Sequence, residues 1–446
     1  MFTRQAALCV VVNLIVAGGV KAQAVNLTEA PLADRCVRNE LTMSLTGKIT
    51  VNQDGKEVVY PHKAEAKHDY VERFLDINGA VSDKAARIYT TAESTITFDN
   101  DKNPPKRTLR EARRFMVAHR HNDQIVSYSP NGALTRDEVD LTEHFDTQAI
   151  SGLLPGKQIE VGKNWPIANN VVAALCDFRL AKHTFEGKLE AVKENIAHIS
   201  IAGTAEGINL GASVKVLVHA RLEFDTREQR IVGLVWEETD ARQQGPITPA
   251  LSADVVIKLK RAPIDVPGDL NNIIIGARVP NGRTPPSELT NIQHSDKRYA
   301  LNYPRNWHIT SPDGAPQLVM RYLERGQFIG QATIMPLKKI DVKNVMALEQ
   351  FAAEMRATPG WIEREENQRE KLPDGPRGQH TVYKVAASGE LDGRAVTQIF
   401  YLIVGTGGDQ VSVTFSIDPQ HVGDLGARDL QLVREIVFPE APGASK

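Results

Sequence analysis

Two histidines one residue apart are the residues best suited to metal chemistry in this sequence, His119 and His121. Residues i and i+2 of a strand point to the same face of a sheet, so two imidazoles on an extended segment could bind one metal ion. The fold would have to bring in further ligands, for which the candidates are His62, His68 and Glu143. The alternative is a solvated pair of histidines in a basic segment, and the sequence leaves both interpretations open.

Other motifs that would indicate a reaction or a cofactor are missing or incomplete. Asp99, Asp101 and Asn103 alternate as in a calcium-binding loop. The sixth position of that loop would hold Pro104 and the twelfth Arg110, where glycine and glutamate are needed. The sequence contains no G-x-S-x-G, P-loop, H-E-x-x-H or C-x-x-C motif. We therefore predict a protein without a cofactor and without enzymatic activity, with a hydrolase or a metal-binding protein as the remaining alternative.

The first 24 residues are typical of a signal peptide. A short apolar run, Ala6–Val20, is followed by the A-x-A motif Ala22-Gln23-Ala24, which predicts cleavage near Ala24 and an exported protein, periplasmic or extracellular. The mature chain then keeps two cysteines, Cys36 and Cys176. An oxidising compartment would allow a disulfide between them, and two separate buried thiols are the equal alternative.

The charge of the chain is nearly balanced, with 53 basic and 55 acidic residues and a formal net charge of −2. This balance gives no reason to expect nucleic acid as a partner. The most basic run, residues 106–120, contains Phe115 as its one aromatic residue. It is interpreted as a solvated element, with a patch that binds an anion or a partner as the alternative. After residue 24, no stretch is long and apolar enough to span a bilayer.

The segment 133–167 is expected to brace a β-rich domain. Thr135 and Glu138 have the spacing of a helix capping box. Asp137, Glu138 and Asp140 in the first turn complement the dipole of such a helix, which accounts for most of the five acidic residues between Asp137 and Asp146 without acid–base chemistry. Strand-forming residues follow and lead to Trp165.

Long strands are predicted on both sides of this segment, because apolar and polar residues alternate with the period of a sheet. Five candidates after the segment lie at hairpin spacing: 182–193, 197–204, 214–225, 230–240 and 254–261. Their length and their glycines predict a curved sheet or an open barrel with one or two helices. Such a sheet could enclose an apolar ligand or lipid, and the inward-facing candidates are Val216, Val218 and Phe224.

A second domain is expected after a Pro/Gly-rich linker, residues 262–292. Residues 293–439 combine a strand, the pair Tyr303-Pro304, Trp307, a hairpin, a helix over 345–357, three strands and a closing helix over 425–438. In this segment Gly405–Gly408 joins two strands, so it is expected to be a hairpin turn and not a phosphate-binding loop.

This order of elements, with Tyr303-Pro304, Trp307 and the final segment Val433–Phe438, resembles the PsbP-like superfamily over residues 297–439. The resemblance implies a non-enzymatic α/β/α sandwich that binds partners, and no residue matches a known partner site, so none is carried over. The sequence Leu153–Trp165 is similar to a strand entry found in exported bacterial β-rich domains without an assigned role.

The predicted fold class is α+β, with two domains that each bury their own core. The expected order is a signal peptide (1–24), a loose leader (25–35), an antiparallel β-rich domain (36–261), the linker (262–292), a PsbP-like domain (293–439) and a tail (440–446). We expect an exported, non-enzymatic binding or scaffold protein whose partner is an unidentified protein or an apolar ligand. A carrier of an apolar ligand or lipid in the β-rich domain is the alternative.

Overall fold

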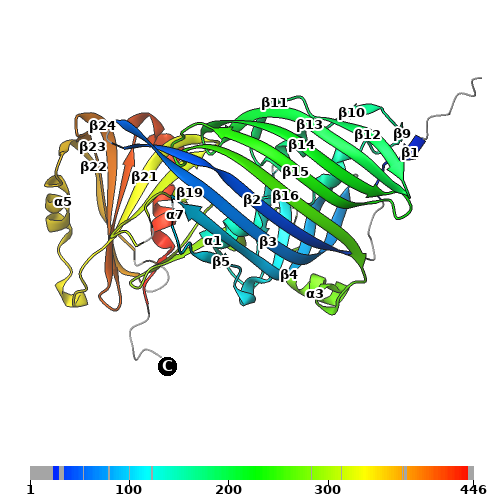
Figure 1. The fold of residues 1–446 in the computed structure, drawn as a ribbon. Coiled ribbons are helices and arrows are strands. Elements are labelled where there is room, and N and C mark those ends of the chain that lie inside the picture. The colour runs from blue at the N-terminus through cyan, green and yellow to red at the C-terminus, as the bar shows by residue number, and fades with distance from the viewer. Residues whose placement is uncertain are drawn as a thin grey trace, which may run out of the picture.

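The computed structural model describes residues 24–29, 35–53, 55–78, 81–99, 101–121, 124–282, 284–312, 314–373, 375 and 379–439. Most of the predicted signal peptide (1–23), part of the predicted leader (30–34) and the tail (440–446) lie outside these described residues. Figure 1 shows a long curved sheet beside a smaller sheet that is flanked by helices. No helix among the described residues combines the length and the apolar character needed to cross a membrane.

A sheet of thirteen strands makes up most of the N-terminal half. Its order in space is β10-β12-β13-β14-β15-β16-β2-β3-β4-β6-β7, with β11 beside β13 and β5 beside β4. No pairing between described strands joins β10 to β7, so the sheet is open, and the prediction of an antiparallel, β-rich, open architecture is confirmed. The bounds are β2 (Cys36–Gln53), β3 (Lys56–Asn78), β4 (Val81–Phe98), β5 (Lys106–Thr108), β6 (Phe115–His121), β7 (Gln124–Tyr128), β10 (Asn164–Pro166), β11 (Arg179–His183), β12 (Glu186–Lys193), β13 (Ile196–Asn209), β14 (Ala212–Asp225), β15 (Arg230–Arg242) and β16 (Ala250–Ile264).

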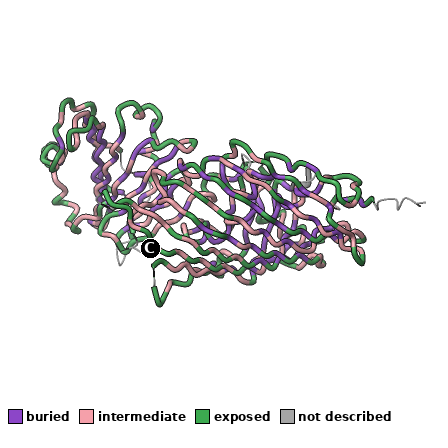
Figure 2. The backbone as a smooth tube through the Cα atoms, turned by 45° about the horizontal axis from the view of Figure 1, so that its top comes forward, coloured by how far each residue is buried: buried purple, intermediate pink, exposed green. Residues whose placement is uncertain are grey.

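The concave face of this sheet is filled by side chains. Along β14 every second residue is buried and those between are exposed, an alternation that Figure 2 shows along the neighbouring strands as well. The inward side chains pack against the helix α2 (Asn169–Cys176) and the 3-10 helix η2 (Ile150–Leu153), which lie inside the curve. Burial of this apolar surface is the main force that holds the sheet around its contents.

The predicted helix that starts at Thr135 is present as α1 (Arg136–Thr142). The Thr135 backbone N–H donates to the Glu138 carboxylate at 2.9 Å, and the Glu138 N–H donates to Thr135 Oγ1 at 3.3 Å, so the capping box is formed. The helix ends at Thr142. The predicted strand after it is split into β9 (Gln158–Glu160) and β10.

The start of the predicted leader is part of the fold, which corrects the expectation of a loose segment. β1 (Ala24–Asn26) pairs with β9, and Leu27 is fully buried in the core beneath the sheet. Glu29 accepts a hydrogen bond from Arg261 Nη1 at 2.7 Å. The segment is held because two apolar side chains and one buried ion pair fix it to the sheet.

The C-terminal sheet has seven strands, in the order β19-β20-β21-β25-β24-β23-β22. The helix α5 (Leu348–Arg356) packs on one face, and α6 (Val422–Leu425) and α7 (Arg428–Arg434) pack on the other. The residues 405–408 form the predicted turn between β24 and β25. The strands are β19 (Trp307–Ile309), β20 (Leu318–Glu324), β21 (Gln327–Pro336), β22 (Trp361–Leu372), β23 (Gln379–Leu391), β24 (Arg394–Gly405) and β25 (Gln410–Ile417).

The closing helix is shorter than the sequence indicated. It stops at Arg434, and Ile436 and Val437 form the strand β26. Two β-branched residues favour an extended backbone, and Pro439 cannot continue a helix, which explains the difference.

A hydrophobic cluster joins the two halves, which corrects the prediction of two independent cores. A four-stranded sheet, β26-β18-β17-β8, connects β8 (Leu134–Thr135) from the first half to β17 (Ile292–Ser295), β18 (Ala300–Tyr303) and β26. Side chains of both halves meet in one buried cluster around it, including Tyr70, Met116, Leu134, Val139, Ile292, Tyr303, Trp307 and Val433.

The predicted linker carries structure of its own. β16 continues to Ile264, and η3 (Gly268–Leu270), α3 (Asn272–Arg278) and α4 (Ser287–Thr290) follow. Leu270 and Val279 are buried against Phe115 and Tyr128 on the convex side of the sheet. The Lys84 ammonium donates to two backbone carbonyls of this segment, at 2.8 and 3.0 Å. The linker is therefore docked on the first half along much of its length.

We predict that the two halves unfold together, because they share this cluster. Leu134→Ala removes a fully buried side chain from it and is expected to destabilise the protein by about 2–4 kcal/mol. Thermal unfolding followed by far-UV circular dichroism and by tryptophan fluorescence should give one coincident transition, lowered in the variant. The matched control is Leu217→Ala on the exposed face of β14, expected to change stability by about 0.5 kcal/mol or less. Two separate transitions, with only one shifted by Leu134→Ala, would contradict the shared core.

Candidate functional site

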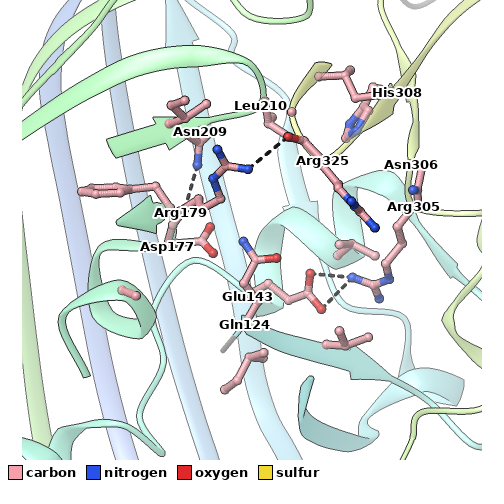
Figure 3. A pocket seen from close by; sticks show the side chains of 18 of the residues that line it. Gln124, Glu143, Asp177, Arg179, Asn209, Leu210, Arg305, Asn306, His308 and Arg325 are labelled. Carbon is pink, nitrogen blue, oxygen red and sulfur yellow. Dashed lines mark hydrogen bonds and ion pairs between the residues drawn. The ribbon is translucent and has the colours of Figure 1, made fainter. Parts of the chain in front are cut away.

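A cavity of about 1000 Å³ lies where the open edges of the large sheet meet the C-terminal half. We call it the junction cavity (Figure 3). From the first half it is lined by α1, α2, β7, β11 and the turn between β13 and β14. The second half contributes Arg305, Asn306, His308 and the turn between β20 and β21. The cavity therefore exists only in the assembled fold.

An ion pair between the two halves forms part of its wall. Arg305 Nη1 donates to both carboxylate oxygens of Glu143, at 2.7 and 2.6 Å. The same guanidinium donates to the backbone carbonyls of Ser127 at 2.6 Å and Thr290 at 3.0 Å, and the Ser127 N–H donates to Glu143. Burial raises the pKa of Glu143, and the neighbouring Arg305 opposes that rise. We call this arrangement the Arg305–Glu143 latch.

The latch also protects a sheet edge. β7 is the last strand of the large sheet, and the outer backbone groups of Ser127 would be open to another strand. Glu143 accepts the N–H and Arg305 donates to the carbonyl, so the two side chains take the place of a neighbouring strand. α1 positions Glu143 for this role, because the residue is the C-cap of the helix and its N–H donates to Val139 O.

Asp177 faces the latch across the cavity (Figure 3). It is the C-cap of α2 in a left-handed conformation, with φ of +51°, and its carbonyl accepts a hydrogen bond from Asn209 Nδ2 at 2.7 Å. Its carboxylate makes no hydrogen bond to another described residue. The side chain is exposed and lines the cavity, and the protein that surrounds it, together with the charges of Glu143 and Asp146, raises its pKa to about 7.

Four arginines line the cavity, and two of them are neutralised locally. Arg136 pairs with Asp140 at 2.9 Å, and Arg305 belongs to the latch. Arg179 comes from β11, and its Nη1 is 3.5 Å from the carbonyl oxygen of Arg325. Arg325 lies in the turn after β20 with φ of +53° and turns its side chain into the cavity (Figure 3). The guanidinium of Arg325 has no hydrogen bond or ion pair with the residues that the structure describes.

Two histidines contribute buried imidazoles. His308 is 9% exposed, and its Nδ1 has no hydrogen-bond partner among the described residues. Burial lowers its pKa to about 4, and the charge of Arg136 adds to this effect. His144 stacks on His68 with ring centroids 4.6 Å apart, and burial lowers its pKa to about 4 as well. Both imidazoles are therefore neutral at pH 7.

The residues predicted for metal binding lie in different surroundings. His119 is buried in β6, whereas His121 is exposed at the end of that strand. His62 stacks on Phe98, and His68 and Glu143 have the partners described above. Within the described ranges, no group of three or more His, Cys, Asp or Glu side chains is arranged to hold a metal ion.

The other predicted site residues are also accounted for. Cys36 and Cys176 are free thiols in the structure, the first in the cluster under the linker and the second beside the core of the large sheet. Val216, Val218 and Phe224 are at most 1% exposed and pack in that core, and they do not line the junction cavity.

Sequence reasoning did not identify the residues of the junction cavity. The acidic run was attributed to the helix dipole, yet Glu143 binds Arg305 and Asp146 pairs with Arg120. A local signal existed only for Arg325, which stands in a predicted hairpin turn. Asp177 and Arg179 follow a helix end that carries no motif.

Comparisons with known proteins give limited similarity. No protein family and no curated protein matches the chain. The solution structure of cyanobacterial PsbP from Synechocystis is 13% identical with a TM-score of 0.26, and the match covers 33% of this chain and 92% of that protein. A structure of lipovitellin with its lipid–protein interactions is 9% identical with a TM-score of 0.30, covering 52% of this chain and 26% of that one. The similarity to PsbP is thus limited to a segment, and these scores assign no family and no function.

We predict that the Arg305–Glu143 latch stabilises the protein. Arg305→Met leaves a half-buried carboxylate without its partner and is expected to cost about 2–3 kcal/mol of unfolding free energy, measured by urea denaturation. The double variant Arg305→Met/Glu143→Gln should recover part of that loss. Arg298→Met, which breaks the exposed pair with Asp296, is the matched control and should cost about 0.5 kcal/mol or less. Equal effects of the two single arginine variants would contradict the latch.

We predict that His144 makes the protein less stable in acid. Its pKa is about 6.5 in the unfolded chain and about 4 in the folded chain, so between these values the unfolded chain binds the extra proton. Unfolding free energy should therefore fall as pH drops from 6.5 toward 4, by up to about 1.4 kcal/mol per pH unit for this group. His144→Asn should reduce that slope in urea titrations at pH 7.5, 6, 5 and 4.5. The buried acids contribute equally to the pH dependence of the wild type and of the variant, so their contribution cancels when the two slopes are subtracted. An unchanged slope in His144→Asn would contradict the prediction.

Proposed function

We propose that this protein is an exported, non-enzymatic binding protein that holds a small ligand in the junction cavity. The observation that carries the proposal is a cavity of about 1000 Å³ whose lining includes two charged groups, the carboxylate of Asp177 and the guanidinium of Arg325, that have no hydrogen bond or ion pair with other described residues. Small-molecule sites are concave and combine apolar walls with a few polar groups that fix the orientation of the ligand, and this cavity has both features. Export rests on the A-x-A motif that ends at Ala24.

The size and walls of the cavity support the same proposal. A volume of about 1000 Å³ is at the upper end of small-molecule sites. Apolar side chains of Phe178, Leu180, Ile208 and Leu210 share the lining with the polar groups. A cavity with both kinds of wall suits a ligand that has a polar and an apolar part.

The proposal places the ligand at the junction and not beneath the curved sheet. A carrier of an apolar ligand would need space next to Val216, Val218 and Phe224, and other side chains fill that space. The C-terminal half, with helices on both faces of its sheet, has the layers expected of a PsbP-like sandwich, and we propose that it serves as the wall that closes the cavity.

A hydrolase would use two carboxyl groups in different protonation states, and a raised pKa at Asp177 is the observation that favours it. Its partner would have to be Glu143, whose two oxygens are both bonded to Arg305. A carboxylate held in this way is not free to attack a substrate or to activate water. The geometry therefore favours binding over catalysis.

Filling the cavity should abolish ligand retention. Native mass spectrometry of the purified mature protein is expected to show an additional non-covalent mass, and Ala173→Trp, which places a large side chain in the cavity, should lose it. The matched control, Ala202→Trp, lies on the exposed face of β13 and should keep it. Circular dichroism confirms that both variants fold. Retention of the same mass by Ala173→Trp would overturn the proposal, and so would a protein that carries no bound mass and binds no added small molecule.

A further inference from the structure

The charges of the junction cavity do not cancel within the protein. Its lining carries four arginines and three carboxyl groups, from Asp140, Glu143 and Asp177. Arg136 and Arg305 are bonded to Asp140 and Glu143, and these four groups neutralise each other. Two arginines, Arg179 and Arg325, remain against the one carboxyl group of Asp177. The part of the cavity between β11 and the β20–β21 turn is therefore positive even when Asp177 is ionised.

The two remaining arginines come from opposite halves of the molecule, and the Arg179 side chain meets the backbone of Arg325. Arg179 is on the edge strand β11, and Arg325 is in the hairpin turn of the C-terminal sheet, where its carbonyl oxygen lies 3.5 Å from Arg179 Nη1. The turn at Gly211 and the turn at Gly326 are in close backbone contact. A side chain at Gly211 would not fit, because its Cβ would lie 2.7 Å from the carbonyl oxygen of Gly326. Figure 3 shows both guanidinium groups beside the open space. The planar guanidinium of Arg325, which has no partner among the described residues, has the donor geometry that suits a carboxylate or a phosphate group, and Arg179 adds a second positive charge to the lining.

The apolar part of the lining indicates where the rest of the ligand lies. Leu180, Ile208 and Leu210 surround the position of the arginines with apolar surface. An acid group on an apolar or mixed body fits these walls better than a fully polar ion.

From these contacts we infer that the ligand is an organic anion, whose carboxylate or phosphate group is bound by the unpaired guanidinium of Arg325 in the positive field to which Arg179 contributes, while its apolar part lies against Leu180, Ile208 and Leu210. This inference rests on the proposed function, because it names the ligand class of the same cavity. The shared chemistry is an acid group with at least two oxygen acceptors. Arg136 and Arg305 hold the wall in place and are not counted as ligands.

The inference is tested with three probes that share one alkyl chain: hexanoate, hexyl phosphate and 1-hexanol. Isothermal titration calorimetry at constant ionic strength is expected to give at least about tenfold tighter binding for one of the anions than for the neutral alcohol. The stronger of the two anions identifies a carboxylate or a phosphate as the natural head group. Equal binding of all three would overturn the inference.

Substitutions of the two arginines test whether these residues bind the anion. Arg179→Gln and Arg325→Gln are each expected to lower the affinity of the protein for the preferred anion about tenfold and to leave its affinity for 1-hexanol unchanged. The matched control is Arg221→Gln, which changes an exposed arginine on the outer face of β14. It should leave the affinities for the anion and for 1-hexanol unchanged. Loss of alcohol binding together with the anion would indicate a collapsed cavity and would count against the inference, as would a normal anion affinity in both variants.

The outcomes separate this inference from the proposed function. If native mass spectrometry shows a retained molecule that is neutral or cationic, and Ala173→Trp removes it, the proposed function holds and the anion inference is wrong. If no molecule is retained and none of the three probes binds, the proposed function fails and the inference fails with it.

Discussion

The ion pair between Arg305 and Glu143 is the contact on which the arrangement of this molecule depends. It joins residues that are 162 positions apart in the chain, and it also bonds the backbone of Ser127 and Thr290. A single guanidinium therefore ties the C-terminal half to α1, to the edge strand β7 and to the end of the linker. Because its donors are shared among three elements, the pair fixes an orientation between the halves that hydrophobic contact alone would leave less specific.

Packing and charge have separate roles at this junction. The shared cluster around Leu134 and Ile292 supplies the apolar burial that brings the halves together. The latch then fills one side of the junction, and the arginines that it does not neutralise face the remaining space. The cavity is thus a consequence of how two curved surfaces meet, and its positive character comes from residues that the packing leaves without partners.

The sequence predicted the local parts of this structure well. The capping box of Thr135 and Glu138, the alternation along β14 and the hairpin turn at Gly405 are all present, because each depends on residues close together in the chain. It failed at the start of the leader, at the end of the last helix and at the separation of the two cores. At the leader and at the shared core a distant partner changed the outcome, as Arg261 did for Glu29, whereas the last helix ended early because of the β-branched residues and the proline that follow it.

The sequence by itself determined the antiparallel, β-rich class, the positions of most strands and the lack of familiar catalytic motifs, since periodicity and motif spacing are local properties. Only the tertiary structure decided that β8 and β17 pair in parallel, that the concave face is filled and that Asp177, Arg179 and Arg325 surround one cavity. The physical reason is that the site is built from three hairpin ends and two helix termini, and no fixed separation in the sequence relates residues at such positions. Its members become neighbours only after the sheet has curved and the two halves have docked.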